Sequence, residues 1–358
     1  MKGLFKRSLL ALLGLVVTFI LISCRPDKSE AQEIGRMMFY NVENLFDVAD
    51  DPLTDDGDYT PDGELHWTKE RYRTKRENIA WVISNIGGWE MPAIVGLSEV
   101  ENRGVISDLL SLDTFRNIEY DYSVTESADP RGIDVALLWD KSKFKHIESR
   151  EIPHYGALAS FPLGRDPRIE GEETGSGRNT LWVTLEHRPT ARRLNIFVMH
   201  NPSRRSGVRE TDEKRMEVTG KVRDIINDIW HKDPSHNIVV MGDFNDNPSD
   251  RSLKKGLGAQ GIEANTPLKP DRLYNLAFAP FNNGKGTHKF EGEFWMPDQI
   301  IVSGGMLLGD EPMVRDRQLT IFSDEELFTR KGNLRRTYAG PHYNGGYSDH
   351  LPVYIKLY

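Results

Sequence analysis

The chain has 358 residues, of which 38% are hydrophobic and 28% are charged, so it can bury a large core as one large domain or two smaller ones. Its formal net charge is -8, which excludes a polycation that grips nucleic acid over its whole surface. Any binding of phosphate must therefore come from local basic residues or from a bound metal.

The N-terminus has the pattern of an export signal. A basic start precedes residues 9–22, an uncharged run that is shorter than the roughly 20 residues of a membrane-spanning helix. The following "LISC" resembles the lipobox of bacterial lipoproteins, and Cys24 is the only cysteine in the chain. We predict a lipoprotein signal peptide at residues 1–23, lipidation of Cys24 and a polar tether at residues 24–32. An uncleaved N-terminal anchor is the alternative.

This leader implies a location and changes the charge. The protein would be exported and lipid-anchored to a bacterial membrane, at its periplasmic face or at the cell surface. Cleavage would remove three positive charges, those of Lys2, Lys6 and Arg7, and leave a mature chain at -11. The sequence shows no protein partner.

From residue 33 onward, apolar runs alternate with amphipathic stretches and predict a single α+β domain over residues 33–358. One predicted helix begins near Lys69, with the basic run 69–76 on its solvent-exposed face, and a second passes through Met216 and Ile229. The predicted strands are residues 37–42, 93–100, 133–139, 181–187, 194–200, 237–241, 299–303 and 351–357. This pattern indicates a sandwich of mixed sheets with helices packed outside it.

Polar residues stand where these apolar strands meet loops. They are Asn41, Glu43, Glu99, His200, Asp243, Asn245, Asp298, Asp349 and His350. Because neighbouring strand ends share one edge of a sheet, residues far apart in the sequence can converge there. Carboxylate, amide and imidazole groups without a thiolate favour Mg²⁺, with Mn²⁺ or Ca²⁺ as alternatives, over zinc or copper.

Other catalytic systems lack their motifs. "GLSEV" lacks the second glycine of a nucleophile elbow, and the chain contains no HExxH and no GxGxxG after a strand. Metal-assisted hydrolysis remains. Phosphate esters are its natural substrates, because the ion neutralises the charge that develops on the phosphoryl oxygens.

The ordered motifs resemble those of the endonuclease/exonuclease/phosphatase superfamily of deoxyribonuclease-like hydrolases. They are "MMFYNVENLFD", "GLSEVEN", "RGIDVALLWD", "MHNPSRR", "MGDFNDNP", "MPDQIIVS" and "YSDHLPVYIKLY", in the family's order over nearly the whole mature chain. The resemblance implies a four-layer α/β/β/α sandwich of two mixed β-sheets flanked by helices.

The resemblance also implies a metal site. Glu99 would be the principal metal ligand, with Glu43 and Asp349 as direct or water-mediated ligands. His200 would donate a hydrogen bond to a phosphoryl oxygen. Glu101 would share a strand face with Glu99 if the strand continued, so the two glutamates could be confused.

Catalytic roles follow in the same way. Asn41 would orient Asp243, and Asp243 with Asn245 would align the attacking water and the phosphate. His350, held in its tautomer by Asp298, would be the acid/base or the electrostatic partner of the pentavalent phosphorus.

For several further residues the predicted roles are less specific. Gly242 would let the backbone turn after the strand, and Asp246 would serve turn chemistry. Asn201 stands where exported relatives often have an aromatic residue, which puts substrate stacking there in doubt. The candidate phosphate contacts are Arg131, Arg178, Arg204 and Arg205, each of which could equally be an ordinary surface arginine.

The predicted function is a divalent-metal-dependent phosphodiester hydrolase, foremost an endonuclease acting on DNA or RNA outside the cytoplasm. The "NPSRR" segment supplies local positive charge against an acidic body. One alternative is a phosphodiesterase or phosphatase for lipid or small-molecule phosphoesters. A non-catalytic surface binding lipoprotein is an alternative of another class, and it would predict missing ligands.

Overall fold

The structure, a computed structural model, describes residues 33–156, 161–163, 177–290, 292–309 and 312–358. The chain divides into two units, Met1–Glu33 and Ile34–Tyr358. The predicted signal peptide, Cys24 and the tether lie outside the described residues. Among the described residues, no helix is both long enough and apolar enough to cross a membrane.

The unit Ile34–Tyr358 contains two large mixed β-sheets. The six-stranded sheet has the order β15-β18-β1-β2-β4-β3, and the eight-stranded sheet has the order β10-β11-β14-β9-β8-β7-β5-β6. The strands of the first are β1 Gly35–Leu45, β2 Ile94–Val100, β3 Tyr120–Val124, β4 Asp134–Asp140, β15 Thr320–Ile321 and β18 Val353–Leu357. Those of the second are β5 Phe144–Pro153, β6 Phe161–Pro162, β7 Asn179–His187, β8 Arg193–His200, β9 Asn237–Asp243, β10 Ala259–Gln260, β11 Leu273–Asn275 and β14 Asp298–Ser303.

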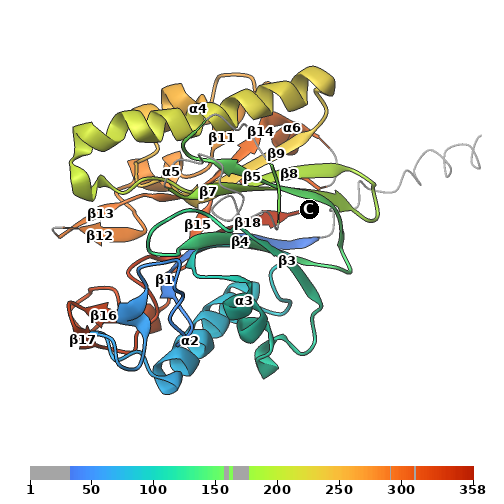
Figure 1. Cartoon of the computed structure of the whole chain (residues 1–358). Helices are drawn as coiled ribbons and strands as arrows, with labels where there is room; N and C mark the ends of the chain where they lie inside the picture. The colour runs from blue at the N-terminus through green and yellow to red at the C-terminus, as the bar shows by residue number, and fades with distance from the viewer. Residues whose placement is uncertain (1–32, 157–160, 164–176, 291, 310–311) are drawn as a thin grey trace, which may run out of the picture. The chain divides into compact units, whose positions relative to one another are not determined.

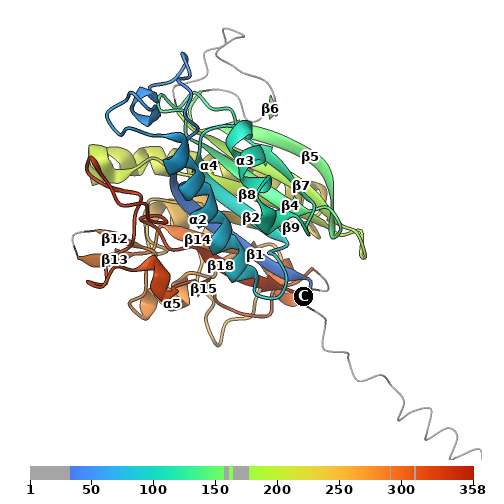
Figure 2. The ribbon, with the colours of Figure 1, turned by 90° about the horizontal axis from the view of Figure 1, so that it is seen from below.

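Helices cover the outer faces of both sheets. Figure 1 shows α4 over the eight-stranded sheet, and Figure 2 shows α2 and α3 over the six-stranded sheet. The helices are α2 Lys69–Gly87, α3 Arg103–Leu110, α4 Val208–Lys232, α5 Phe278–Asn282 and α6 Gly304–Leu308. Two small hairpins, β12 His288–Phe290 with β13 Glu293–Trp295 and β16 Tyr338–Ala339 with β17 His342–Tyr343, flank the sheets. The predicted four-layer α/β/β/α sandwich is confirmed.

Strand periodicity explains why each sheet is buried on both faces. Along β1, Met37 and Phe39 join the core between the two sheets, whereas Met38 and Tyr40 join the core under α2. Successive side chains of a strand point to opposite faces, so a continuous apolar run supplies both cores. A third core joins α4 to the outer face of the eight-stranded sheet.

The main predicted elements are present, and the differences have local causes. The helix predicted near Lys69 begins there, capped by the Thr68 side chain, which accepts from the backbone N–H of Arg71. The last strand begins at Val353 rather than at residue 351, because Pro352 has no N–H to contribute to the ladder. The prediction omitted β5, since its polar residues hide the apolar alternation of a strand that pairs with β7.

Candidate active site

The register of the eight-stranded sheet gathers three of the predicted residues. Asp243, the last residue of β9, lies directly opposite Asp298 in the antiparallel pair with β14. It also lies beside His200 in the parallel pair with β8. Positions more than 40 residues apart in the chain therefore become neighbours through backbone pairing alone.

Gly242 contributes to this pairing in an unexpected way. It lies within β9 rather than in a turn, and a Cβ atom at this position would stand 2.2 Å from the carbonyl oxygen of Met199 in β8. The expectation that Gly242 lets the backbone turn was wrong. A glycine is needed here because the two strands approach too closely for any side chain.

The six-stranded sheet brings Asn41 and Glu99 to the same site through irregular strand ends. Pairing of β2 with β4 shifts its register between Ser98 and Val100, and Glu99 has a positive φ of 61°. This bulge separates Glu99 from Glu101, because the simple alternation of side chains is broken between them. Glu101 instead accepts a 2.6 Å hydrogen bond from the backbone N–H of Asp47.

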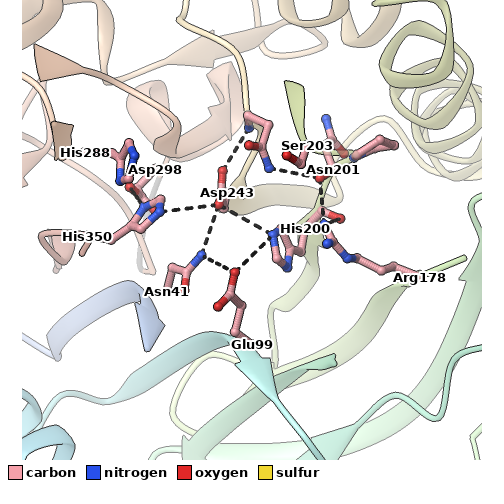
Figure 3. A network of polar contacts seen from close by, with 12 residues as sticks. Asn41, Glu99, Arg178, His200, Asn201, Ser203, Asp243, His288, Asp298 and His350 are labelled. Carbon is pink, nitrogen blue, oxygen red and sulfur yellow. Dashed lines mark hydrogen bonds and ion pairs between the residues drawn. The ribbon is translucent and has the colours of Figure 1, made fainter. Parts of the chain in front are cut away.

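Asn41 connects the two sheets at the centre of the site (Figure 3). Its Nδ2 donates to Asp243 Oδ2 at 3.0 Å and to Glu99 Oε1 at 3.3 Å. Its Oδ1 accepts from the backbone N–H of Glu43 at 3.0 Å, which fixes the orientation of the amide. Asn41 therefore orients the carboxylates of Asp243 and Glu99 at the same time.

His350 and Asp298 form a buried dyad. Asp298 Oδ2 lies 2.7 Å from His350 Nδ1 and also accepts from the hydroxyl of Thr287. Burial lowers the pKa of His350, but the attraction and hydrogen bond of Asp298, with the charge of Asp243, outweigh it and raise that pKa well above 6.5. At neutral pH His350 is therefore a cation, with its Nε2 3.9 Å from Asp243 Oδ2.

Asp243 faces this cation as a carboxylate. Burial raises its pKa to about 6, against the opposing charge of His350 and the hydrogen bonds from the Asn245 backbone and Asn41. The backbone N–H of Asn245 donates to Asp243 Oδ1 at 2.9 Å. The side chain of Asn245 donates to the carbonyl of Asn201 at 3.0 Å, and its amide oxygen has no hydrogen bond among the described residues.

His200 has the opposite protonation state. Burial, together with the charges of Arg178 and Arg131, holds its pKa well below 6.5, so the ring is neutral. Its Nε2 lies 3.6 Å from Asp243 Oδ2 and 3.8 Å from Glu99 Oε1, distances of polar contacts rather than of an ion pair. A neutral ring can donate one hydrogen bond, which suits contact with a phosphoryl oxygen.

The sequence matches the model of the endonuclease/exonuclease/phosphatase family over residues 36–358. The chain belongs to this family. Family members are metal-dependent phosphoesterases, so this chain is an enzyme that hydrolyses phosphoester bonds with a divalent metal. No curated protein matches the sequence.

Several solved structures share the fold of this phosphoesterase. A mannosyl-6-phosphatase of Bacteroides thetaiotaomicron VPI-5482 matches with a TM-score of 0.52 at 17% identity, over 90% of this chain and 99% of that chain. A family protein of Bacteroides vulgatus matches with a TM-score of 0.53 at 14% identity, over 90% and 98%. The human Nocturnin catalytic domain matches with a TM-score of 0.50 at 16% identity, over 91% and 96%. At these identities the likeness establishes the fold.

The carboxylates of the phosphoesterase suit a divalent cation. Arg336 lies among three of these carboxylates. Burial acts to lower the pKa of its guanidinium, but the charges of Asp349, Glu43 and Glu99 outweigh burial and raise that pKa. Burial, and then the charge of Asp349, raise the pKa of Glu43, as expected where carboxylates are crowded in a medium of low dielectric. These hard oxygen donors fit Mg²⁺, and a cation would relieve their repulsion.

The three carboxylates differ in their freedom to bind a metal. Glu43 accepts from Arg336 Nε at 3.1 Å and from the backbone N–H of Thr337 at 2.6 Å, while Asp349 Oδ2 accepts from Arg336 Nη2 at 2.9 Å. Glu99 accepts only from Asn41 and from the backbone N–H of Asn44 among the described residues. Glu99 is therefore the one of the three that has no ion pair with Arg336 among the described residues, and its part as principal metal ligand stays a prediction.

The predicted phosphate-binding arginines have different environments. Arg204 pairs with Asp246 and Asp250 and donates to the carbonyl of Asn245, so its guanidinium is used within the protein. Arg178 pairs with Asp129 at 3.2 Å. Arg131 is 46% exposed in its side chain, with Asp129 at 3.9 Å, and Arg205 is exposed.

Asp246 does more than turn chemistry. It is buried, lies 2.9 Å from the guanidinium of the fully buried Arg215, and accepts from the hydroxyl of Ser252. It therefore anchors two arginines beneath the loop that carries Asn245.

Sequence reasoning missed three residues near the site. Lys75, assigned to a solvent-exposed face, is 1% exposed, and its ammonium donates to the hydroxyl of Thr337 at 2.6 Å and to the carbonyl of Tyr347 at 2.8 Å. Arg336 bridges Glu43 and Asp349, and the His288 ring lies 4.5 Å from that of His350. No local pattern marks them, because each depends on a partner more than 10 residues away.

Two clusters of described residues have ligand atoms within 4.8 Å of one another. One contains His288, Asp349 and His350, and the other contains Asp243, Asp298 and His350. In the second cluster, Asp298 is already hydrogen-bonded to the cationic His350, which disfavours a cation there. Neither cluster includes Glu43 or Glu99.

Proposed function

We propose that this phosphoesterase is a Mg²⁺-dependent phosphodiesterase that cleaves DNA or RNA strands outside the cytoplasm. The observation that carries the proposal is the convergence of Asn41, His200 and His350 on Asp243, with Glu99 joined to this group through Asn41 and His200 (Figure 3). Mn²⁺ or Ca²⁺ would be held by the same oxygen donors.

The residues divide the chemistry between them. Glu99 would hold the metal, with Glu43 and Asp349 as direct or water-mediated ligands. A bound divalent ion would neutralise charge on the phosphoryl oxygens. Asp243 is ionised above its pKa of about 6 and can orient and deprotonate the attacking water.

The two histidines would contact the phosphoryl group in different protonation states. Cationic His350 stabilises the negative charge of the pentavalent transition state and can protonate the leaving oxygen. Neutral His200 donates a hydrogen bond to a phosphoryl oxygen. Neither residue needs to change its charge for the substrate to bind.

A small-molecule phosphoester is the second candidate substrate. The "NPSRR" segment offers less positive charge to nucleic acid than its sequence indicates. Arg204 pairs with Asp246 and Asp250, so Arg205 is the arginine of this segment that remains for a phosphate. The shared fold with a mannosyl-6-phosphatase keeps a sugar phosphate among the compounds to test. A non-catalytic binding protein has no support, since its predicted loss of site residues does not occur.

The test is a panel of substrates with purified mature protein. Plasmid, single-stranded DNA, RNA, mannose 6-phosphate, sphingomyelin and bis(p-nitrophenyl) phosphate are incubated with Mg²⁺, Mn²⁺ or Ca²⁺. We expect cleaved nucleic acid with Mg²⁺ and none with excess chelator or in Asp243→Asn. Faster turnover of mannose 6-phosphate or sphingomyelin than of every nucleic acid would overturn the proposal in favour of the second candidate.

A further inference from the structure

An open cavity of about 390 Å³ lies next to two carboxylates of the catalytic site, Glu43 and Asp349, because Arg336 lines the cavity and pairs with both. Its lining includes Phe328, Leu334, Arg330, Arg335 and Arg336. The volume lies within the range of sites for small ligands. Since Arg336 also bridges Glu43 and Asp349, one guanidinium separates the cavity from the proposed metal site.

The lining of the cavity is cationic. It contains three arginines and no acidic residue. Arg335 is paired with Glu326 at 2.9 Å, and Arg336 is paired with the catalytic carboxylates. Arg330 is exposed and has no hydrogen bond or ion pair among the described residues, so its five donors are available to a ligand.

The backbone around the cavity is fixed before any ligand arrives. Phe328 and Leu334 form an antiparallel bridge, and the turn between them is closed by a 2.7 Å hydrogen bond from the Thr329 N–H to the carbonyl of Asn333. The backbone N–H of Arg335 donates to the carbonyl of Leu327 at 2.8 Å. This hydrogen-bonded turn places the Arg330 backbone beside the cavity, so only the side chain has to be ordered when a ligand binds.

We propose that this cavity binds a second phosphate group of the substrate, beside the phosphoester that is cleaved. The inference rests on the proposed function and narrows the substrate class to molecules that carry at least two phosphates, such as a nucleic-acid strand or a phosphorylated dinucleotide. Arg330 supplies the uncommitted charge, and bidentate contact with phosphate oxygens is the geometry that a guanidinium favours.

The first experiment measures binding without catalysis. Inorganic phosphate is titrated by calorimetry into protein stripped of metal on a chelating resin, so that no metal can bind the phosphate. We expect Arg330→Gln to weaken binding about tenfold, as for the loss of a charge-assisted contact. Lys331→Gln removes the same charge from the same turn without lining the cavity, and it should change the affinity by less than about twofold. Equal affinity in wild type and Arg330→Gln, or no binding to wild type, would overturn the proposal.

The second experiment identifies the source of the phosphate. A dinucleotide is compared with its 5′- and 3′-phosphorylated forms. We expect one terminal phosphate to lower KM about tenfold in wild type and in Lys331→Gln, and this gain to be lost in Arg330→Gln. A terminal phosphate that leaves KM unchanged in wild type contradicts a subsite for substrate phosphate. An Arg330→Gln substitution that lowers kcat/KM by the same factor for all three substrates contradicts it as well. If no diester is cleaved at all, the proposed function fails, while the phosphate titration still decides whether the cavity binds phosphate.

Discussion

Two histidines at this site differ in charge because their partners differ. Burial lowers the pKa of both, but only His350 has a carboxylate, Asp298, against its Nδ1. His200 has carboxylates only at 3.6 and 3.8 Å from its Nε2, and the positive charges of Arg178 and Arg131 add to the effect of burial on its pKa. The environment therefore assigns one ring as a cation and the other as a neutral donor, although the two have the same intrinsic chemistry.

Replacing Asp298 by Asn tests the charge of His350. Without the carboxylate, burial acts on His350 with less opposition, so its pKa falls. We expect kcat to fall about 10²-fold or more and the alkaline limb of the pH profile of kcat/KM to move to lower pH. NMR titration of the His350 ring measures the pKa separately from activity, and an unchanged ring pKa in Asp298→Asn would contradict the role of the dyad.

The pair of His350 and Asp298 should also make the free energy of unfolding depend on pH. Because the folded pKa of His350 is raised above about 6.5, its contribution to stability is complete below that pH and is lost as pH rises through the folded pKa. In Asp298→Asn this alkaline loss of stability should be smaller, since the folded pKa is nearer to the unfolded value. Denaturant unfolding at a series of pH values measures the difference.

At the scale of elements, strand irregularities decide which side chains reach the site. The bulge at Glu99 separates it from Glu101, and the close pairing of β8 and β9 holds His200 beside Asp243. Glu43 and Asn44 also have positive φ values, of 52° and 59°. Non-glycine residues in this region store strain, which commonly marks functional positions.

Gly242→Ala tests the pairing of β8 and β9. The new methyl group would meet the Met199 carbonyl at 2.2 Å, so the strands must separate. We expect a loss of about 3 kcal/mol in the free energy of unfolding and a marked fall in kcat, because Asp243 follows directly. Gly220→Ala in α4, where nothing lies within 4 Å of the new atom, is the control and should stabilise by about 0.5–1 kcal/mol. Similar unfolding energies for the two variants would refute this account of Gly242.

At the scale of the molecule, the site joins the two sheets. Asn41 and Glu99 come from the six-stranded sheet, whereas His200, Asp243 and Asp298 come from the eight-stranded sheet. The proposed metal ligands Glu43, Glu99 and Asp349 lie in β1, in β2 and shortly before β18 of the six-stranded sheet. These segments are far apart in the chain, so a cation held by all three would bind the folded state and not the unfolded chain.

Metal binding should then raise thermal stability. At a Mg²⁺ concentration about a hundred times the Kd, the folded state gains about 2.7 kcal/mol, and Tm rises by several degrees. Glu99→Gln should lose most of this rise, whereas Glu77→Gln, on the exposed face of α2, should retain it. Thermal unfolding with Mg²⁺ and with excess chelator measures both, and an equal rise in both variants would exclude Glu99 as a ligand.

The sequence also leads us to propose that the whole molecule is anchored to a membrane through a lipid on Cys24. Cys24→Ser should abolish incorporation of labelled palmitate and move the protein from the membrane fraction to the soluble fraction of the cell envelope. Activity on a soluble substrate should stay within about twofold, since the substitution lies outside the catalytic unit. Retention of the label in the variant would show that Cys24 is not the lipidated residue.

The sequence by itself determined the order of the motifs along the chain and the family that they resemble. It also determined which acidic and imidazole residues stand at the ends of strands. It did so because an apolar run followed at once by a polar residue is a local pattern, legible without knowing the partner strand. The expected convergence of Asn41, Glu99, Asp243 and His350 follows from strand ends sharing an edge.

Only the tertiary structure decided which charges are free. Lys75 lies in a basic run yet is buried, Arg204 pairs with acidic neighbours, and Arg336 joins Glu43 to Asp349. The requirement at Gly242 likewise depends on the adjacent strand. Each of these depends on a contact between segments far apart in the chain, and such contacts set burial and pairing, which no local pattern of residues encodes.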